Sequence, residues 1–160
     1  MITRNLHNYF IAHLTCVNTI VITRSGNTTN LNPYATGAFK TNGEISTSLA
    51  GVANSQYART IRIGSGTTEP TYDDYELQQM INVAPKTVAS SRSGEKQNNY
   101  DILTATFLNE TDADWVVTEV GEYLATDNKN ETVALLLARE VFDPVTVKPG
   151  QTFSVSMKLF

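Results

Sequence analysis

The feature that most constrains the fold of this chain is a regular succession of short alternating segments from residue 59 onward. Residues 100–108 place Leu103, Ala105 and Phe107 on one side and more polar residues on the other, which is the period of a β-strand. Similar segments occupy residues 60–64, 80–89, 115–123, 132–140 and 151–160. Strands of this length and spacing predict an all-β protein, an antiparallel β-sandwich (jelly-roll-like or immunoglobulin-like) or a barrel.

Several residues refine the expected strands. Pro85 should place segment 80–89 at an edge or bend, because proline cannot donate to a ladder. Asp143-Pro144 and the run 148–150 are turn signals. Segment 132–140 is nearly all apolar, which predicts burial on both faces or a central position. Strict alternation in segment 115–123 would place Trp115, Val117, Glu119 and Gly121 on one side.

The first 58 residues follow a different pattern. Residues 3–14 predict a short helix capped by Thr3, and residues 17–23 predict a strand. Residues 25–32 read as a loop at the start of a polar region, 25–58, for which the sequence leaves three alternatives: an extended arm, a long excursion or a pair of irregular strands. Such segments often contact a partner. We therefore expect a β-core over 59–160, and a helix, strand and polar arm over 1–58, in one continuous domain with part of 1–58.

Composition excludes several classes of function. The net charge of −4, with acidic residues scattered, provides no basic field for nucleic acid. The single cysteine, Cys16, excludes an internal disulfide and a cysteine-only zinc site, and we expect it to be a small core residue. No apolar run approaches the roughly 20 residues needed to cross a bilayer. We expect a soluble protein made without a signal sequence.

The segment from Ile61 to Leu77 turns through Gly64 and Gly66 and contains Pro70 and Asp74. A phosphate-binding loop needs a lysine after its last glycine and a helix that follows. Here no lysine follows, and a proline stands where the helix would begin. The pattern predicts no nucleotide or other cofactor, but a tight turn with positive φ at one of the two glycines.

Two groups of residues were considered as metal sites. Asp73, Asp74 and Glu76 could offer oxygen ligands to calcium, but their spacing differs from that of an EF-hand loop. The favoured interpretation is a solvated acidic loop in which one aspartate caps a short helical turn toward Leu77. His7 and His13, six residues apart, do not share a helix face as an i, i+4 zinc pair does. The sequence therefore predicts no metal site.

Two charged residues lie within apolar strands. Glu119 belongs to a Val-Val-Thr-Glu-Val-Gly run, and Arg139 follows an apolar run. A buried charge requires a partner. We hypothesise that Glu119 and Arg139 pair across neighbouring strands, the alternative being that both lie on a solvent face.

Three pieces of sequence, in this order, resemble small β-rich structural proteins of tailed bacteriophages. The pieces are Ile61–Pro70 with Asp74 and Leu77, then Val117–Tyr123, then Leu135–Phe142 with Val147–Gly150. In such proteins, a "GxGtt-x-P…D-x-x-L" segment precedes a "tEvG" strand and an "LLaRe-x-f" strand. The resemblance covers roughly residues 60–160, and residues 1–58 lie outside it. It supplies no catalytic residues.

The resemblance implies a non-enzymatic virion component, made in the bacterial cytoplasm and assembled with capsid, neck or portal, tail or fibre proteins. Its expected partners are other virion proteins and further copies of itself in a homo-oligomer, with no direct contact to nucleic acid or membrane. The alternative is a carbohydrate- or receptor-binding module of a fibre, supported by loop aromatics: Tyr34, Phe39, Tyr57, Tyr72 and Tyr75. An enzyme, such as a glycosidase with two carboxylates, is disfavoured because no spacing selects a catalytic pair.

Overall fold

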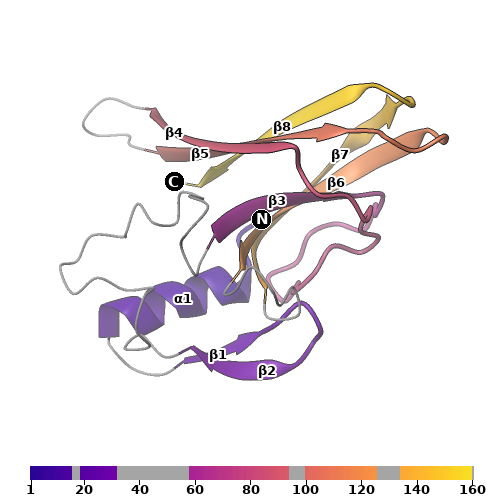
Figure 1. The fold of residues 1–160 in the computed structure, drawn as a ribbon. Coiled ribbons are helices and arrows are strands. Elements are labelled where there is room, and N and C mark those ends of the chain that lie inside the picture. The colour runs from indigo at the N-terminus through magenta and orange to yellow at the C-terminus, as the bar shows by residue number, and fades with distance from the viewer. Residues whose placement is uncertain (16–18, 32–57, 94–99, 126–133, 160) are drawn as a thin grey trace.

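The computed structural model describes residues 1–15, 19–31, 58–93, 100–125 and 134–159. These residues form one helix and eight strands (Figure 1). The elements are α1 (Arg4–Thr15), β1 (Thr19–Ile22), β2 (Thr28–Leu31), β3 (Ala58–Gly64), β4 (Thr87–Ser93), β5 (Tyr100–Leu108), β6 (Trp115–Ala125), β7 (Leu135–Val147) and β8 (Thr152–Leu159). The expected mostly-β class and the short N-terminal helix are confirmed.

The strands form three antiparallel sheets. β1 and β2 make a hairpin, whose turn contains Gly26 at φ 79°. The two larger sheets have the orders β3-β6-β7 and β4-β5-β8. Figure 1 shows them one above the other, with the helix and hairpin below β3-β6-β7.

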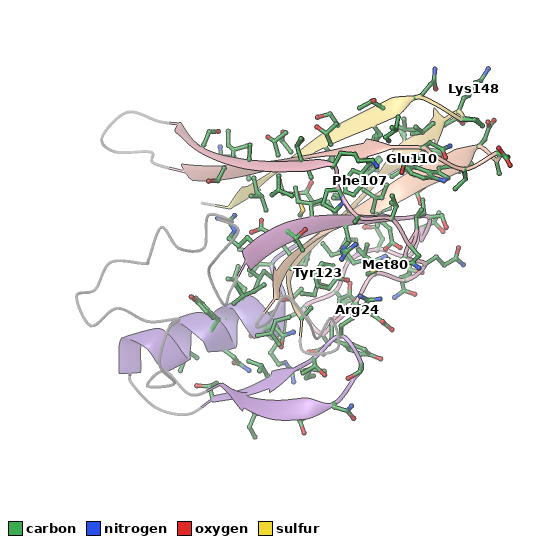
Figure 2. All side chains as sticks on the ribbon, viewed as in Figure 1. Arg24, Met80, Phe107, Glu110, Tyr123 and Lys148 are labelled. Carbon is green, nitrogen blue, oxygen red and sulfur yellow. The ribbon has the colours of Figure 1, made fainter. Side chains whose placement is uncertain are left out.

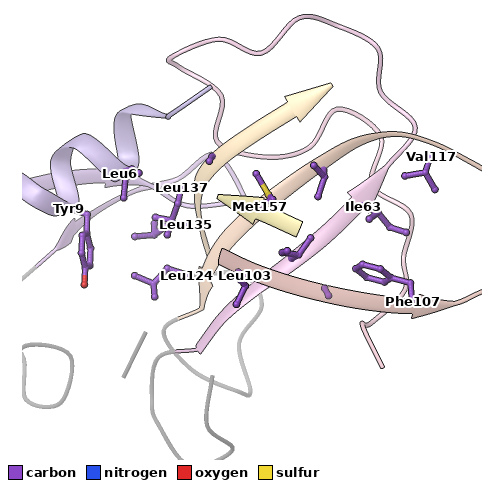
Figure 3. Close-up of a cluster of buried hydrophobic side chains, with 14 of the residues drawn as sticks. Leu6, Tyr9, Ile63, Leu103, Phe107, Val117, Leu124, Leu135, Leu137 and Met157 are labelled. Carbon is purple, nitrogen blue, oxygen red and sulfur yellow. The ribbon is translucent and has the colours of Figure 1, made fainter. Parts of the chain in front are cut away.

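One hydrophobic core joins the two larger sheets. β3 contributes Ile61 and Ile63, and β5 contributes Leu103, Ala105 and Phe107, all fully buried (Figure 3). Complete burial of each large aliphatic or aromatic side chain contributes about 1.5–3 kcal/mol. The alternation expected for residues 100–108 is therefore confirmed, because Leu103, Ala105 and Phe107 all face this core.

The helix belongs to the same core. Leu6 and Tyr9 of α1 pack in the cluster with residues of β7, including Leu135 and Leu137 (Figure 3). Asn5 ties the helix to β1, since its amide donates to Ile22 O at 2.7 Å and its oxygen accepts from Ile22 N at 2.8 Å.

Thr3 does not cap the helix as predicted. Its hydroxyl donates instead to Leu136 O at 2.6 Å, because Met1 to Thr3 run alongside β7.

Apart from shifts of a few residues at the ends of other elements, four features differ from the prediction. Thr28–Leu31 is a strand, although residues 25–32 were predicted to be a loop; the remainder of the polar excursion, 32–57, lies outside the described residues. The strand predicted at 80–89 begins only at Thr87, and it extends through Ser93 into the predicted polar connection. Pro85 lies before this strand, where no ladder bond is lost.

Asp143-Pro144 is the fourth difference, because it lies inside β7 and is no turn. The pairing of β6 with β7 is irregular here: Val117 opposes Val145, while Glu119 opposes Val141. A bulge admits a proline without loss of a ladder bond. The turn predicted at 148–150 is present, with Gly150 at φ 76°. β7 is buried on both faces over residues 135–139 as predicted, yet it lies at a border of its sheet.

The same bulge overturns the expected alternation of β6. Trp115 and Val117 face the core, but beyond the bulge Val120 faces the core instead. Glu119 and Gly121 therefore lie on the opposite face of the sheet from Trp115. Between these pairs β6 advances by two residues while β7 advances by four. The phase of the β6 side chains changes at this irregularity, and the change creates the site described next.

Candidate functional site

The candidate site lies on the face of β3-β6-β7 that points away from β4-β5-β8. Residues 65–79, which follow β3, fold back over this face, and Tyr123 and Met80 lie on this side in Figure 2. At its centre Glu119 is 0% exposed. Its Oε1 accepts hydrogen bonds from Gly66 N (3.0 Å) and Gln79 N (2.8 Å), and its Oε2 accepts one from Gln78 N (3.1 Å). One carboxylate therefore holds both ends of the loop.

Arg139 balances the charge of Glu119. Its Nε donates to Glu119 Oε2 at 2.9 Å, and its Nη1 donates to Asp74 Oδ2 at 2.9 Å. The structure thus brings together the two residues hypothesised to pair, from neighbouring strands, and adds a third partner from the loop. Arg139 is 0% exposed. Removal of one partner from such a buried pair leaves an uncompensated charge, which typically costs about 3–5 kcal/mol.

Asp74 fixes the middle of the loop. Its carboxylate accepts from Thr71 N at 3.0 Å and from Thr71 Oγ1 at 2.8 Å, in addition to Arg139. Burial alone would raise the pKa of Asp74, but the hydrogen bonds from Thr71 and the charge of Arg139 outweigh it and lower the pKa below its usual value. The predicted helical turn toward Leu77 is absent, because Asp74 closes a loop with the preceding Thr71 instead.

The two glycines of the loop are needed for space. Neither Gly64 nor Gly66 has the predicted positive φ. A Cβ on Gly64 would lie 2.4 Å from Glu119 Oε1, and one on Gly66 would lie 2.7 Å from the same atom. Only glycine lets the backbone approach the carboxylate this closely.

Leu77 anchors the end of the loop. Its side chain packs with Tyr123 and Leu136, and its N–H donates to the Tyr123 hydroxyl at 2.8 Å. A Cβ on Gly121 would lie 2.8 Å from Leu77, so this glycine provides the space for the anchor. Burial raises the pKa of the Tyr123 hydroxyl.

The remaining residues of the acidic loop face solvent. Pro70 is partly exposed, and Asp73 forms an exposed ion pair with Arg4. Tyr72 and Tyr75 are 43% and 37% exposed. Tyr72 also contacts the helix, since its ring lies edge-on to His7.

Sequence reasoning missed a second buried ion pair, between Arg59 of β3 and Glu122 of β6. Both side chains lie on the core face, as their register shows: Arg59 opposes Leu124, and Glu122 opposes Ile61. The sequence contained a signal for this pair. Arg59 is two residues before Ile61, so the alternation of a β-strand places both side chains on the same face. Two charges of opposite sign at core positions of adjacent strands predict such a pair.

The hydrogen-bonding capacity of Glu119 is used within the protein. Each oxygen of the Glu119 carboxylate accepts two hydrogen bonds from the protein itself. The carboxylate is also fully buried, so a substrate cannot reach it. Within the described ranges, no three His, Cys, Asp or Glu residues are grouped as metal ligands would be. Nor does the described part of the chain contain a helix that is long and apolar enough to cross a membrane. Cys16, Tyr34, Phe39 and Tyr57 lie outside the described residues, as does the side chain of His13.

Comparisons of the chain with protein-family models, with curated proteins and with solved structures found no match.

Proposed function

We propose that the chain is a non-enzymatic structural component of a tailed-phage virion that assembles through protein–protein contacts. The observation that carries this proposal is the convergence of the three resembling pieces on one buried network. Gly66 and Asp74 come from the first piece, Glu119 from the second and Arg139 from the third, and they touch one another directly. The residues behind the resemblance are thus those that hold the fold together.

A particle subunit needs a fixed shape more than a reactive site. The network supports this requirement, because a charged cluster closed by backbone N–H groups fixes one loop conformation. The two antiparallel sheets with their shared core are compatible with a β-sandwich of the jelly-roll or immunoglobulin-like kind, which is the finer fold class we propose. Repetition on a particle would allow weak single contacts to act together.

The proposal is tested by mass spectrometry of purified particles from the phage or prophage whose genome encodes the chain. We expect its peptides in particles purified by density gradient, at several copies for each copy of the portal protein. Particles that lack the peptides, while the infected cell lysate contains them, would contradict a virion role.

The alternative is a carbohydrate- or receptor-binding module. Tyr72 and Tyr75 favour it, because both are exposed aromatic rings and sugars stack on such rings. Each is followed in the sequence by an exposed acidic residue, Asp73 or Glu76. Binding of the isolated protein to a glycan array, lost in Tyr72→Ala and Tyr75→Ala but kept in Val116→Ala, another exposed position, would support this alternative. An array without signal would favour the structural role alone.

A further inference from the structure

Other segments of the chain cover the outermost strands of the two larger sheets to different extents. At the border strand β3, Ser65 N donates to Gln79 O and Ile81 N donates to Ile63 O, at 2.8 and 2.9 Å. At the border strand β7, Arg139 N donates to Met1 O and Thr3 N donates to Leu137 O, both at 3.0 Å. Each border of β3-β6-β7 is therefore covered in part by an extended segment.

The border strand β8 has no such cover among the described residues. It lies at the end of the order β4-β5-β8, and its backbone is described over its whole length (Figure 1). The opposite border, β4, runs into residues that lie outside the described part of the chain. β8 is therefore the border strand of this sheet that neither begins nor ends beside a gap of several residues in the described part of the chain.

The register shows which groups of β8 point outward. Backbone groups along an antiparallel strand face its two neighbours alternately. In β5, Thr106 O faces β4, since it accepts from Lys86 N at 2.7 Å, whereas Asn109 N donates to Gln151 O on the side of β8 at 2.9 Å. Odd-numbered residues of β5 thus face β8, and they oppose Phe153, Val155 and Met157.

It follows that the outward backbone groups of β8 belong to the intervening residues, Thr152, Ser154 and Ser156. Their N–H and C=O groups lie in the plane of the sheet and point away from β5. Their side chains are exposed on the solvent face of the sheet. A row of outward N–H and C=O groups is a template for a further strand. Proline, charged side chains such as lysine, and bulges are the usual means of blocking such pairing. The ladder of β8 with β5 is continuous and contains no proline, and the single lysine, Lys158, lies near the end of the strand.

The core face of β8 is also incomplete. Phe153 and Val155 pack against the hydrophobic core yet stay partly exposed, whereas Met157 is fully buried. A strand added beside β8 would cover the exposed parts of both side chains. The border therefore offers backbone hydrogen bonds and apolar contact together, the combination that strand addition uses.

We propose that β8 pairs with β8 of a second copy of this chain, antiparallel and about a two-fold axis at Val155. This inference rests on the proposed structural role and gives it a contact surface. The register places Ser154 opposite Ser156 of the second copy, so outward backbone groups face outward backbone groups. The two copies of β4-β5-β8 then form one continuous sheet.

The composition of β8 favours a second copy over a different partner. Lys158 is its one charged residue, and it lies at opposite ends of the paired strands, so no like charges meet. Apolar Val155 faces itself, and hydroxyls face hydroxyls. A strand that presents compatible residues to its own reversed sequence is self-complementary, as a two-fold interface requires.

The inference is tested by sedimentation equilibrium over a wide range of protein concentration. We expect the wild-type mass to rise from that of one chain to that of two. In the double variant Ser154→Lys/Ser156→Lys, lysines face lysines across the axis, and the dimer should weaken by about tenfold or more. In Ser154→Lys/Ser156→Glu each lysine faces a glutamate, and dimerisation should return to at least the wild-type level.

The matched control places lysines on the opposite border of the same sheet. Ala89→Lys/Ser91→Lys in β4 adds the same charge at exposed positions and should leave the dimer unchanged. Circular dichroism verifies that all variants fold. A wild-type protein that stays a single chain, or a dimer that survives in Ser154→Lys/Ser156→Lys, would overturn the inference. Neither result would bear on the presence of the chain in particles, which tests the proposed function separately.

Discussion

The two larger sheets share a core, but the rest of the chain covers their outer faces and border strands to different extents. In β3-β6-β7 the outer face is covered by a loop held on Glu119 and Arg139, and both borders are covered in part by the chain. In β4-β5-β8 the outer face presents hydroxyls, such as the Thr104–Ser156 pair at 2.7 Å, and β8 is open among the described residues. The first sheet is built for internal stability, and the second leaves groups available for contact.

This difference shows where polar groups are costly in free energy, because they are buried, and where they remain available for contact, because they are exposed. Each charge in the covered face requires a partner, since an unpaired buried charge costs several kcal/mol. Hydroxyls on the open sheet are solvated and cost little. Substitutions of equal chemistry should therefore have large effects on stability in the first sheet and small ones in the second.

The largest effect is expected for Glu119→Ala. It leaves Arg139 with Asp74 as its remaining carboxylate partner, and it leaves three backbone N–H groups without an acceptor. We expect the free energy of unfolding, measured by chemical denaturation, to fall by about 3–5 kcal/mol. Glu140→Ala, at an exposed position of β7, is the control and should stay within about 0.5 kcal/mol. A loss below about 0.5 kcal/mol for Glu119→Ala would refute the network as a stabilising centre.

Gly66→Ala should be next in size. The added Cβ would lie 2.5 Å from the Gln78 Cβ and 2.7 Å from Glu119 Oε1. Because the loop and the buried carboxylate must both shift, we expect a loss of about 1–3 kcal/mol in the same assay. Thr67→Ala, at the adjacent exposed residue, should be nearly neutral. Equal effects of the two substitutions would show that close approach to Glu119 is not what requires glycine.

Tyr123→Phe removes the acceptor of the Leu77 N–H. The expected loss is about 1–2 kcal/mol near neutral pH, because a buried donor is left unsatisfied. Burial raises the pKa of Tyr123 in the folded protein above its ordinary value of 10.0, so its contribution is complete below pH 10 and is lost as pH rises above it.

The difference between the wild type and Tyr123→Phe should therefore shrink in alkaline denaturation experiments. Tyr72→Phe, which changes an exposed ring, serves as the control. It should leave the free energy of unfolding unchanged at both neutral and alkaline pH. A difference that grows above pH 10 would contradict the assignment of the buried hydroxyl.

Asp74→Asn should have the smallest effect of the four, about 1 kcal/mol at neutral pH. In the folded protein, burial is outweighed by the hydrogen bonds from Thr71 and the charge of Arg139, which lower the pKa of Asp74 below its ordinary value of 3.8. Its stabilisation is therefore present above pH 3.8 and is lost as pH falls through the lowered pKa. Asp73→Asn, in an exposed pair with Arg4, should stay within about 0.5 kcal/mol. Identical acid unfolding curves for Asp74→Asn and the wild type would count against the contact with Arg139.

The features of the fold that depend on local periodicity could be predicted correctly from the sequence. The alternation of β5 and the glycine turn after β7 were both present in the residues themselves. What local pattern could not supply was the phase change in β6, because a bulge is fixed by pairing with β7. Strict alternation placed Glu119 on the side of Trp115, and the structure places it on the other side.

The candidate site was visible in the sequence only in part. Glu119 and Arg139 stood out as charges in apolar strands, so their pairing could be proposed. Gly64 and Gly66 were assigned a turn conformation, because one-dimensional sequence does not show which atom approaches a glycine. Their actual neighbour, Glu119, is more than fifty residues away, as the separation of 53 between Gly66 and Glu119 shows.

The most direct test of the central claim is native-state amide hydrogen exchange at Gly66, Gln78 and Gln79. These three N–H groups donate to the Glu119 carboxylate, so we predict exchange nearly as slow as that of β5 and β6 core amides in the wild type. In Glu119→Gln their protection should fall selectively, while β5 amides keep theirs under conditions where the variant stays folded. Fast exchange of these amides in the wild type would contradict the claim that Glu119 holds the loop.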